Sequence, residues 1–175
     1  VPVELRALVA KAGAVLAVAR GPEGQAAVGT KQGLFLSDKA GTRQVFPRHG
    51  HKSWAPTNVT VSYDGLGRLW FASYQGAGCY EKSKWTLYTG AEGLPYDDMT
   101  AVAGGADGTV WFGTAIGAIR FDGSAWSYRQ GKRWLPSDEV RDIAVDAGGN
   151  AWVATAGGLS FIHFKGMTLA AKAKH

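Results

Sequence analysis

The segment DGTVWFGTAIGAIRFDG, residues 107–123, places a glycine three residues before a tryptophan, small residues shortly after it, and a second glycine six residues after it. Related segments occur over residues 23–37, 65–82 and 148–162. Self-similarity of this kind indicates a chain built from repeated structural units, so the period has to be established before any single strand is assigned.

The repeat has a constant spacing. Trp70, Trp111 and Trp152 are equally spaced along the chain. Four other positions keep the same interval: the glycines before the tryptophan (Gly67, Gly108, Gly149), the hydroxyl residues after it (Ser73, Thr114, Thr155), the second glycines (Gly76, Gly117, Gly158) and upstream aliphatic residues (Val61, Val102, Ile143). A weaker first copy has Val18 at the aliphatic position and Ala27 at the tryptophan position.

Each unit predicts four short strands. In the third copy these cover residues 100–104, 110–114 and 117–121, and the fourth, over 125–129, opens the next stretch; glycine-bearing turns typical of antiparallel hairpins lie between them. A tandem four-stranded antiparallel sheet of about 40–45 residues is the blade of a β-propeller. We therefore predict an all-β propeller over residues 1–162, in units of 1–37, 43–80, 84–121 and 125–162, and a basic tail over 163–175 that is disordered or begins a helix.

The constant spacing also predicts roles within a blade. We expect Trp70, Trp111 and Trp152 to pack as wedges between neighbouring blades, because large aromatic rings contribute most to a core of this kind. We expect the small residues Gly113 and Thr114 to let adjacent strands approach each other near the propeller axis.

The repeat is consistent with three ways of closing the ring of blades. The segment VPVEL, residues 1–5, precedes Val18 by the same interval by which Trp85 precedes Val102, in the register of an outer fourth strand, whereas the last unit ends after its third strand at Ile162. The N-terminal strand is thus expected to pair beside that third strand and remove an exposed edge. The arrangements are a four-bladed ring, an eight-bladed ring of two chains, or a segment of a longer propeller. We favour a segment of a longer propeller, because both ends of the sequence look excised and the first unit matches the repeat only weakly.

Composition limits the partners. The net charge is +5, but Lys165, Lys172 and Lys174 in the tail supply +3 of it, so the body carries 16 basic against 14 acidic residues. A nearly neutral body argues against a nucleic-acid partner. Cys79 is the single cysteine, which excludes an internal disulfide and predicts a buried, inert thiol. No signal peptide or membrane span is visible, and a start without methionine indicates a processed or excised chain.

The blade motif, in DGTVWFGTAIGAIRFDGSAW (107–126) above all, resembles the two-component regulator propeller repeat. The resemblance extends through IAVDAGGNAWVATAGGLSFI (143–162) and YDGLGRLWFASYQGAGCYE (63–81), and covers about residues 14–162. It implies a propeller that serves as an extracytoplasmic sensor or ligand-binding part of a larger protein, in the periplasm or outside the cell. The run MTLAAKA in the tail resembles the junction to a helical domain.

Candidate binding residues gather in loops between units. The loop over 45–58 contains Arg48, His49, His51, Lys52 and Trp54. His49 and His51 form an H-x-H pair without an evident third ligand, so we predict no metal site. The loops over 89–99 and 130–140 are in register, since Pro95 and Pro136 are separated by one repeat, and we expect both on one face of the propeller.

These two loops combine aromatic and charged side chains. Tyr96, Asp97 and Asp98 lie in one, and Lys132, Arg133 and Trp134 in the other. Sugars are held by aromatic faces with polar groups around them, and arginine binds carboxylates with two parallel hydrogen bonds. The alternative is structural: Asp98 and Glu139 merely start strands, and Arg133 pairs with a neighbouring acid.

No phosphate-binding loop, nucleophile elbow or metalloprotease helix is present. We therefore predict a non-catalytic binding or sensor module without a cofactor. Its expected ligand is a carbohydrate or another extracytoplasmic ligand, and its expected protein partners are further blades, a second copy of the chain or a helical domain. One alternative is a scaffold that mediates oligomerisation. The other is part of a polysaccharide lyase that uses His49 or His51, Tyr96 or Tyr128 as base and Arg133 as the group that neutralises a substrate carboxylate.

Overall fold

The computed structural model describes residues 12–49 and 52–163 as a succession of antiparallel sheets. The first sheet contains β1 (Val15–Arg20), β2 (Ala26–Thr30), β3 (Gly33–Asp38) and β4 (Gly41–Val45), and the second contains β7 (Thr60–Tyr63), β8 (Leu69–Ser73), β9 (Gly76–Glu81) and β10 (Lys84–Tyr88). The third sheet contains β11 (Met99–Gly104), β12 (Val110–Thr114), β13 (Gly117–Phe121) and β14 (Trp126–Arg129), and the last contains β15 (Val140–Val145), β16 (Ala151–Thr155) and β17 (Gly158–Ile162). The small hairpin of β5 (Arg48–His49) and β6 (Lys52–Ser53) and the 3-10 helix η1 (Gly90–Glu92) lie in loops.

The predicted fold class is confirmed. All four strands expected in the third unit form, and their bounds differ from the prediction by at most one residue. Even the first unit, which lacks the tryptophan, forms a complete four-stranded sheet in the order β1-β2-β3-β4. The described chain is therefore a propeller arrangement of four blades. Within it, no helix is long and apolar enough to cross a membrane.

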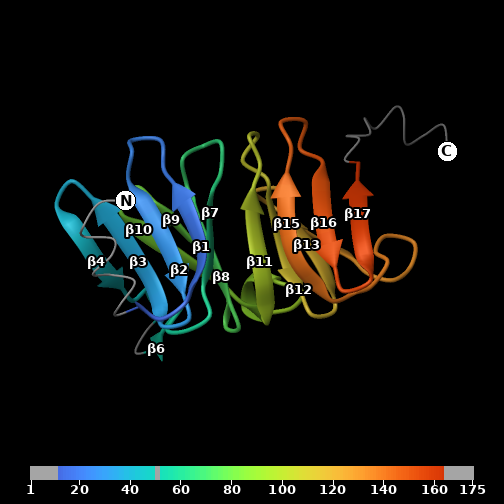
Figure 1. Cartoon of the computed structure of the whole chain (residues 1–175), viewed down its shortest axis with the longest axis horizontal. Helices are drawn as coiled ribbons and strands as arrows, with labels where there is room; N and C mark the ends of the chain where they lie inside the picture. Colours follow the sequence, from blue (N-terminus) through green and yellow to red (C-terminus); the bar gives the residue numbers. More distant parts are fainter. Residues whose placement is uncertain (1–11, 50–51, 164–175) are drawn as a thin grey trace.

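The blades follow one another in chain order. Figure 1 shows them as a row, with the first sheet at one end and β17 at the other. The first strands of consecutive sheets lie side by side, β1 against β7, β7 against β11 and β11 against β15. The fourth strand that we expected from residues 1–5, and the tail beyond His163, lie outside the described residues.

An irregularity in three of these first strands decides which residues face the preceding blade. The pairing register shifts after Val15 in β1, after Met99 in β11 and after Val140 in β15. Such a bulge inserts one residue, so side chains three positions apart fall on the same face. Met99 and Val102 accordingly share one apolar cluster, and Val140 and Ile143 share another.

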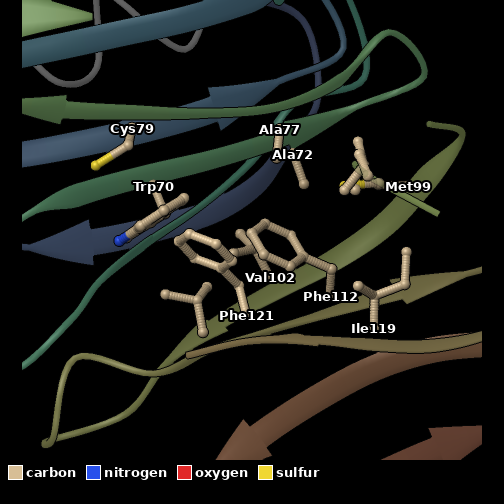
Figure 2. Close-up of a cluster of buried hydrophobic side chains, with 11 residues drawn as sticks. Trp70, Ala72, Ala77, Cys79, Met99, Val102, Phe112, Ile119 and Phe121 are labelled. Carbon is tan, nitrogen blue, oxygen red and sulfur yellow. The ribbon is translucent and has the colours of Figure 1, made fainter. Parts of the chain in front are cut away.

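Tryptophans fill the spaces between blades. Trp70 is fully buried between the second and third sheets (Figure 2). Its ring stacks on Tyr88 at a centroid distance of 5.7 Å and meets Phe112 edge-on at 6.0 Å. Trp111 is buried in the same way between the third and last sheets. The predicted role is thus confirmed for these two residues. Cys79 belongs to the cluster around Trp70, and burial raises the pKa of its thiol to about 12, in agreement with an inert cysteine.

The prediction was wrong for Trp152. Its side chain is 44% exposed, beside Leu159 at 61% and Phe161 at 47%. The reason lies outside the unit itself. A tryptophan at this position is buried by the sheet that follows, and no sheet follows β15–β17 within residues 12–49 and 52–163.

The small residues after the tryptophan have two different functions. A Cβ on Gly113 would lie 2.6 Å from Cγ1 of Val140 on the next sheet, so this glycine permits close approach as expected. Thr114 instead closes the turn to the next strand. Its hydroxyl donates to the Gly117 carbonyl at 2.8 Å and accepts from the Ile116 N–H at 3.1 Å. Thr30 and Thr155 make the equivalent pairs of bonds.

Candidate ligand-binding surface

Three loops connect the outer strand of one sheet to the inner strand of the next. They cover residues 46–59, 89–98 and 130–139, and they share one edge of the propeller with the turns between second and third strands. Backbone hydrogen bonds fix this arrangement at the first and last loops, from Asn58 N–H to the Lys31 carbonyl and from Ala156 N–H to the Glu139 carbonyl. The loops over 89–98 and 130–139 therefore lie at the same edge, as their register suggested.

Each loop is anchored by buried apolar side chains, which in the first loop include Ala55 and Val59 beside Trp54. Trp54, Leu94 and Leu135 enter the clusters between the first and second, second and third, and third and last sheets. The ring of Trp54 is therefore removed from the surface, and we leave this residue out of the candidate surface. Leu94 and Leu135 occupy the same position of the repeat, which was a signal in the sequence that one apolar residue of each loop belongs to the core.

The loop over 130–139 is held in one conformation. N–H groups of Trp134 and Leu135 donate to the Gly131 carbonyl at 2.9 and 3.0 Å, and the Gly131 N–H donates to Oδ1 of Asp138 at 2.6 Å. The Ser160 hydroxyl on β17 donates to the Trp134 carbonyl. These bonds fix the position of the Trp134 backbone before any ligand arrives.

Two arginines contact the exposed ring of Trp134. The Cζ atom of Arg129 lies 4.8 Å from the ring centroid and that of Arg133 lies 5.4 Å from it, both within cation–π range. The ring remains 36% exposed. The ion pair that was the structural alternative for Arg133 is not formed within the described part of the chain, where Glu139 pairs with Arg141 at 3.6 Å.

Sequence reasoning missed Arg129. It lies at the end of β14, donates from Nη1 to the Tyr128 carbonyl at 3.0 Å, and has a buried Nε that finds no acceptor among residues 12–49 and 52–163. The signal was its position, because the last residue of an outer strand enters the loop that carries Arg133. Because that Nε atom is buried, it is not itself exposed to a ligand, and Arg129 contributes to this surface through its cation–π contact with the ring of Trp134.

The other predicted residues divide between surface and core. Asp97 and Asp98 are exposed, while Tyr96 is half-buried against the cluster around Trp70. The Tyr128 hydroxyl donates to the Ile116 carbonyl, and burial is the main cause that raises its pKa. No hydrogen bond, ion pair or ring contact of the described residues joins Tyr96 or Asp97 to Arg133 or Trp134.

The first loop carries three of the predicted residues, Arg48, His49 and His51. Arg48 is exposed on β5, and His49 pairs with Lys52 through the backbone of the β5–β6 hairpin. His51 lies outside the described residues. Among the residues that the structure describes, no group of three or more His, Cys, Asp or Glu side chains could hold a metal ion.

A cleft of about 480 Å³ lies at the opposite edge, between the first and second sheets. Charged side chains and two tyrosines line it, namely Glu23, Asp38, Arg43, Arg68, Glu81, Lys82, Tyr63 and Tyr80. Arg43 and Asp38 pair with each other at 2.7 Å, which lowers the pKa of the Asp38 carboxyl. These charges largely satisfy one another, so the cleft offers fewer free donors than the surface around Trp134.

Comparison with known proteins identifies structural relatives only. No family model and no curated protein matches the sequence. Two solved extracellular domains, from proteins of Bacteroides thetaiotaomicron named as putative hybrid two-component systems, superpose with TM-scores of 0.69 and 0.65 at 17% and 19% identity. They cover 92% and 91% of this chain.

The chain resembles the extracellular propellers of two-component systems. It spans 23% of the length of those two domains. Virginiamycin B lyase from Staphylococcus aureus is also similar, with a TM-score of 0.62 at 15% identity over 89% of this chain and 56% of the lyase. At such identities the likeness establishes the fold and leaves the chemistry to the residues.

Proposed function

We propose that this chain is a non-catalytic binding module of an extracytoplasmic sensor, and that it binds an acidic glycan on the surface formed by Arg129, Arg133 and Trp134. One observation carries the proposal: an exposed indole ring has guanidinium groups 4.8 and 5.4 Å from its centroid. The resemblance to extracellular domains of two-component systems supports the sensor role and the compartment.

The chemistry of the surface fits a sugar that carries a carboxylate. The apolar face of a pyranose ring packs on an aromatic side chain, and a guanidinium binds a carboxylate through two parallel hydrogen bonds. Arg133 has no carboxylate partner in the described structure, and its Cζ atom lies 5.4 Å from the centroid of the Trp134 ring, so its guanidinium is the group that would bind the sugar carboxylate. The fixed backbone of the loop lowers the entropy lost on binding.

The test is titration of the purified chain with uronic-acid oligosaccharides by calorimetry. Trp134→Ala and Arg133→Ala should each weaken binding about tenfold or more, which is about 1.4 kcal/mol, because each removes one of the two interactions that hold the sugar. Arg133→Lys should bind more tightly than Arg133→Ala but more weakly than the wild type, since lysine keeps the positive charge and lacks the paired N–H donors of the guanidinium.

Arg141→Ala is the matched control. It removes one positive charge from an exposed side chain at the start of β15, where Arg141 already pairs with Glu139. Unchanged affinity in this variant, with unchanged thermal unfolding in all of them, assigns the losses to the surface around Trp134. Equal weakening by Arg141→Ala would show that binding depends on net charge alone and would refute the site.

A lyase is the second candidate, because uronate elimination would use the same arginine and a neighbouring base. The position of Tyr128 argues against it as the base, since its hydroxyl proton is engaged by the Ile116 carbonyl and its pKa is raised. Incubation with the same oligosaccharides distinguishes the two. New absorbance in the near ultraviolet from unsaturated ends would establish elimination, and intact sugar with measurable affinity would establish binding.

A further inference from the structure

The two ends of the row of blades each present an apolar face. At the last sheet this face consists of Trp152, Leu159 and Phe161, and at the first sheet Val15 and Val18 stay open, with Val18 64% exposed. The remainder of the first face is covered, because Val28 and Phe35, which lie in register with Val18, are buried in a cluster with Ala12. The equivalents of Val18 in the other units, Val61, Val102 and Ile143, are all buried. Since Val18 and Trp152 are both exposed, the end sheets of one chain do not cover each other at these positions.

An interface inside the chain shows what such faces pack against. Between the third and last sheets, Trp111 and Ala118 of one sheet form a cluster with Val140 and Ile143 of the next. Thr100 reinforces the contact through its hydroxyl, which donates to the Val140 carbonyl at 2.7 Å. The interface therefore joins the second and third strands of one blade to the first strand of the following blade.

The repeat maps both end faces onto this interface. Trp152 and Leu159 occupy the positions of Trp111 and Ala118, one repeat later in the chain. Val15 and Val18 occupy the positions of Val140 and Ile143, because Val15 pairs with Thr30 as Val140 pairs with Thr155, and both strands have the bulge at the same point. The last sheet thus lacks the contact that Val15 and Val18, the exposed part of the first face, would supply.

We propose that two copies of this chain pair head to tail into a closed ring of eight blades, with Val15 and Val18 of each copy packed against Trp152 and Leu159 of the other. A second copy is the occupant that the structure supports, because one chain carries both complementary halves of an interface that it already forms internally. The contact is heterologous, and two such contacts close a two-fold ring without a free apolar end. This inference does not depend on the glycan proposal.

The test uses two single variants of the full chain. Val18→Asp places a charge on the first face only, and Trp152→Asp places one on the last face only, so neither variant retains a complete interface with its own copies. Light scattering behind a sizing column at micromolar concentration should give twice the 18.5 kDa of one chain for the wild type and a single chain for each variant. Both positions are exposed, so folding should be kept. Leu159→Asp replaces Trp152→Asp if circular dichroism shows otherwise.

Mixing the two variants is the decisive step. The Val18→Asp chain still offers an intact Trp152 face and the Trp152→Asp chain an intact Val18 face, so a one-to-one complex should form through a single interface. Native mass spectrometry with one variant isotope-labelled identifies it. The proposal is overturned by a monomeric wild type, by a wild-type mass above two chains, by a mixture that does not associate, or by a Val18→Asp variant that stays dimeric, which would mean that Trp152 faces pair with each other.

Discussion

Asp64 shows how one side chain organises the start of a blade. Its carboxylate is fully buried and accepts hydrogen bonds from Nε of Arg68 at 2.7 Å and from Nε1 of Trp70 at 2.8 Å, and from two backbone N–H groups. Arg68 continues the contact to the next blade by donating to the Gly108 carbonyl at 2.7 Å. One acid therefore fixes a turn, orients a core tryptophan and links two sheets.

Removal of this carboxylate should be costly. Asp64→Ala leaves the partly buried guanidinium of Arg68 and the buried Trp70 N–H without their acceptor, and we expect a loss of about 3 kcal/mol in the free energy of unfolding, measured by urea denaturation. Asp146→Ala is the control, since Asp146 holds the equivalent place in the last unit and binds Asn150 at the surface. A loss for Asp64→Ala no larger than that of the control would contradict the role given to burial.

The equivalent position in the third unit shows a limit of sequence reasoning at this scale. Gly105 stands six residues before Trp111, as Asp64 stands before Trp70, and the buried Nε1 of Trp111 has no acceptor in the part of the chain that is described. The regular spacing of the tryptophans predicted burial of both rings. It did not predict that the ring nitrogen of Trp70 is hydrogen-bonded and that of Trp111 is not. That difference depends on the residue six positions before each tryptophan, which changes from one unit to the next.

At the scale of the strand, close approach of backbones determines where glycine is required. A Cβ on Gly29 in β2 would lie 2.1 Å from the carbonyl oxygen of Val59, which enters the second sheet. The Val59 N–H donates to the Thr30 carbonyl at 3.0 Å, so the two segments are held at this distance. There is no flexible side chain in the contact that could move aside.

Gly29→Ala should therefore destabilise the protein by about 2–3 kcal/mol, the usual cost of an overpacked site that can relax only through the backbone. Gly90→Ala is the matched control, because a Cβ there meets nothing within 4 Å, and it should change stability by less than about 0.5 kcal/mol. Thermal unfolding of both variants provides the comparison. Equal melting temperatures of the two variants would show that the first two sheets can move apart at this contact without loss of stability.

The positions of the strands were predicted best from the sequence, and the burial of individual side chains was predicted least well. Short turns and a fixed repeat spacing located β11–β14 to within one residue. Burial of Trp54 and exposure of Trp152 were not predicted, because each depends on a neighbouring element rather than on the residue's own unit. The loops over 89–98 and 130–139 were placed correctly at one edge, but the pairing of Arg129 with Trp134 required the course of β14.

For the whole molecule, stability should fall toward the end of the row. Strands β12 and β13 are buried along their whole length, whereas β16 alternates between buried and more exposed residues and β17 is buried only at Ile162, because one face of the last sheet is uncovered. Repeat architectures derive much of their stability from contacts between neighbouring units. A unit with one neighbour is consequently held less firmly than a unit with two.

Hydrogen exchange measures this gradient. In the Val18→Asp variant, which we expect to be monomeric, backbone amides of β17 should exchange at least about tenfold faster than those of β13, because local opening of the last sheet breaks fewer contacts. Mass spectrometry of peptides from the two strands gives both rates in one sample. Similar protection in β13 and β17 would mean that the four sheets unfold as one cooperative unit.

The order of strands has a consequence for how the molecule is made. Each described blade consists of strands that are consecutive in the chain, from β1–β4 through β15–β17. A blade can therefore fold as soon as its outer strand has left the ribosome, without waiting for a distant segment. Its tryptophan face then stays open until the next inner strand emerges and docks on it. The order of synthesis therefore sets the order in which blades fold, and each finished blade provides the surface on which the next blade packs.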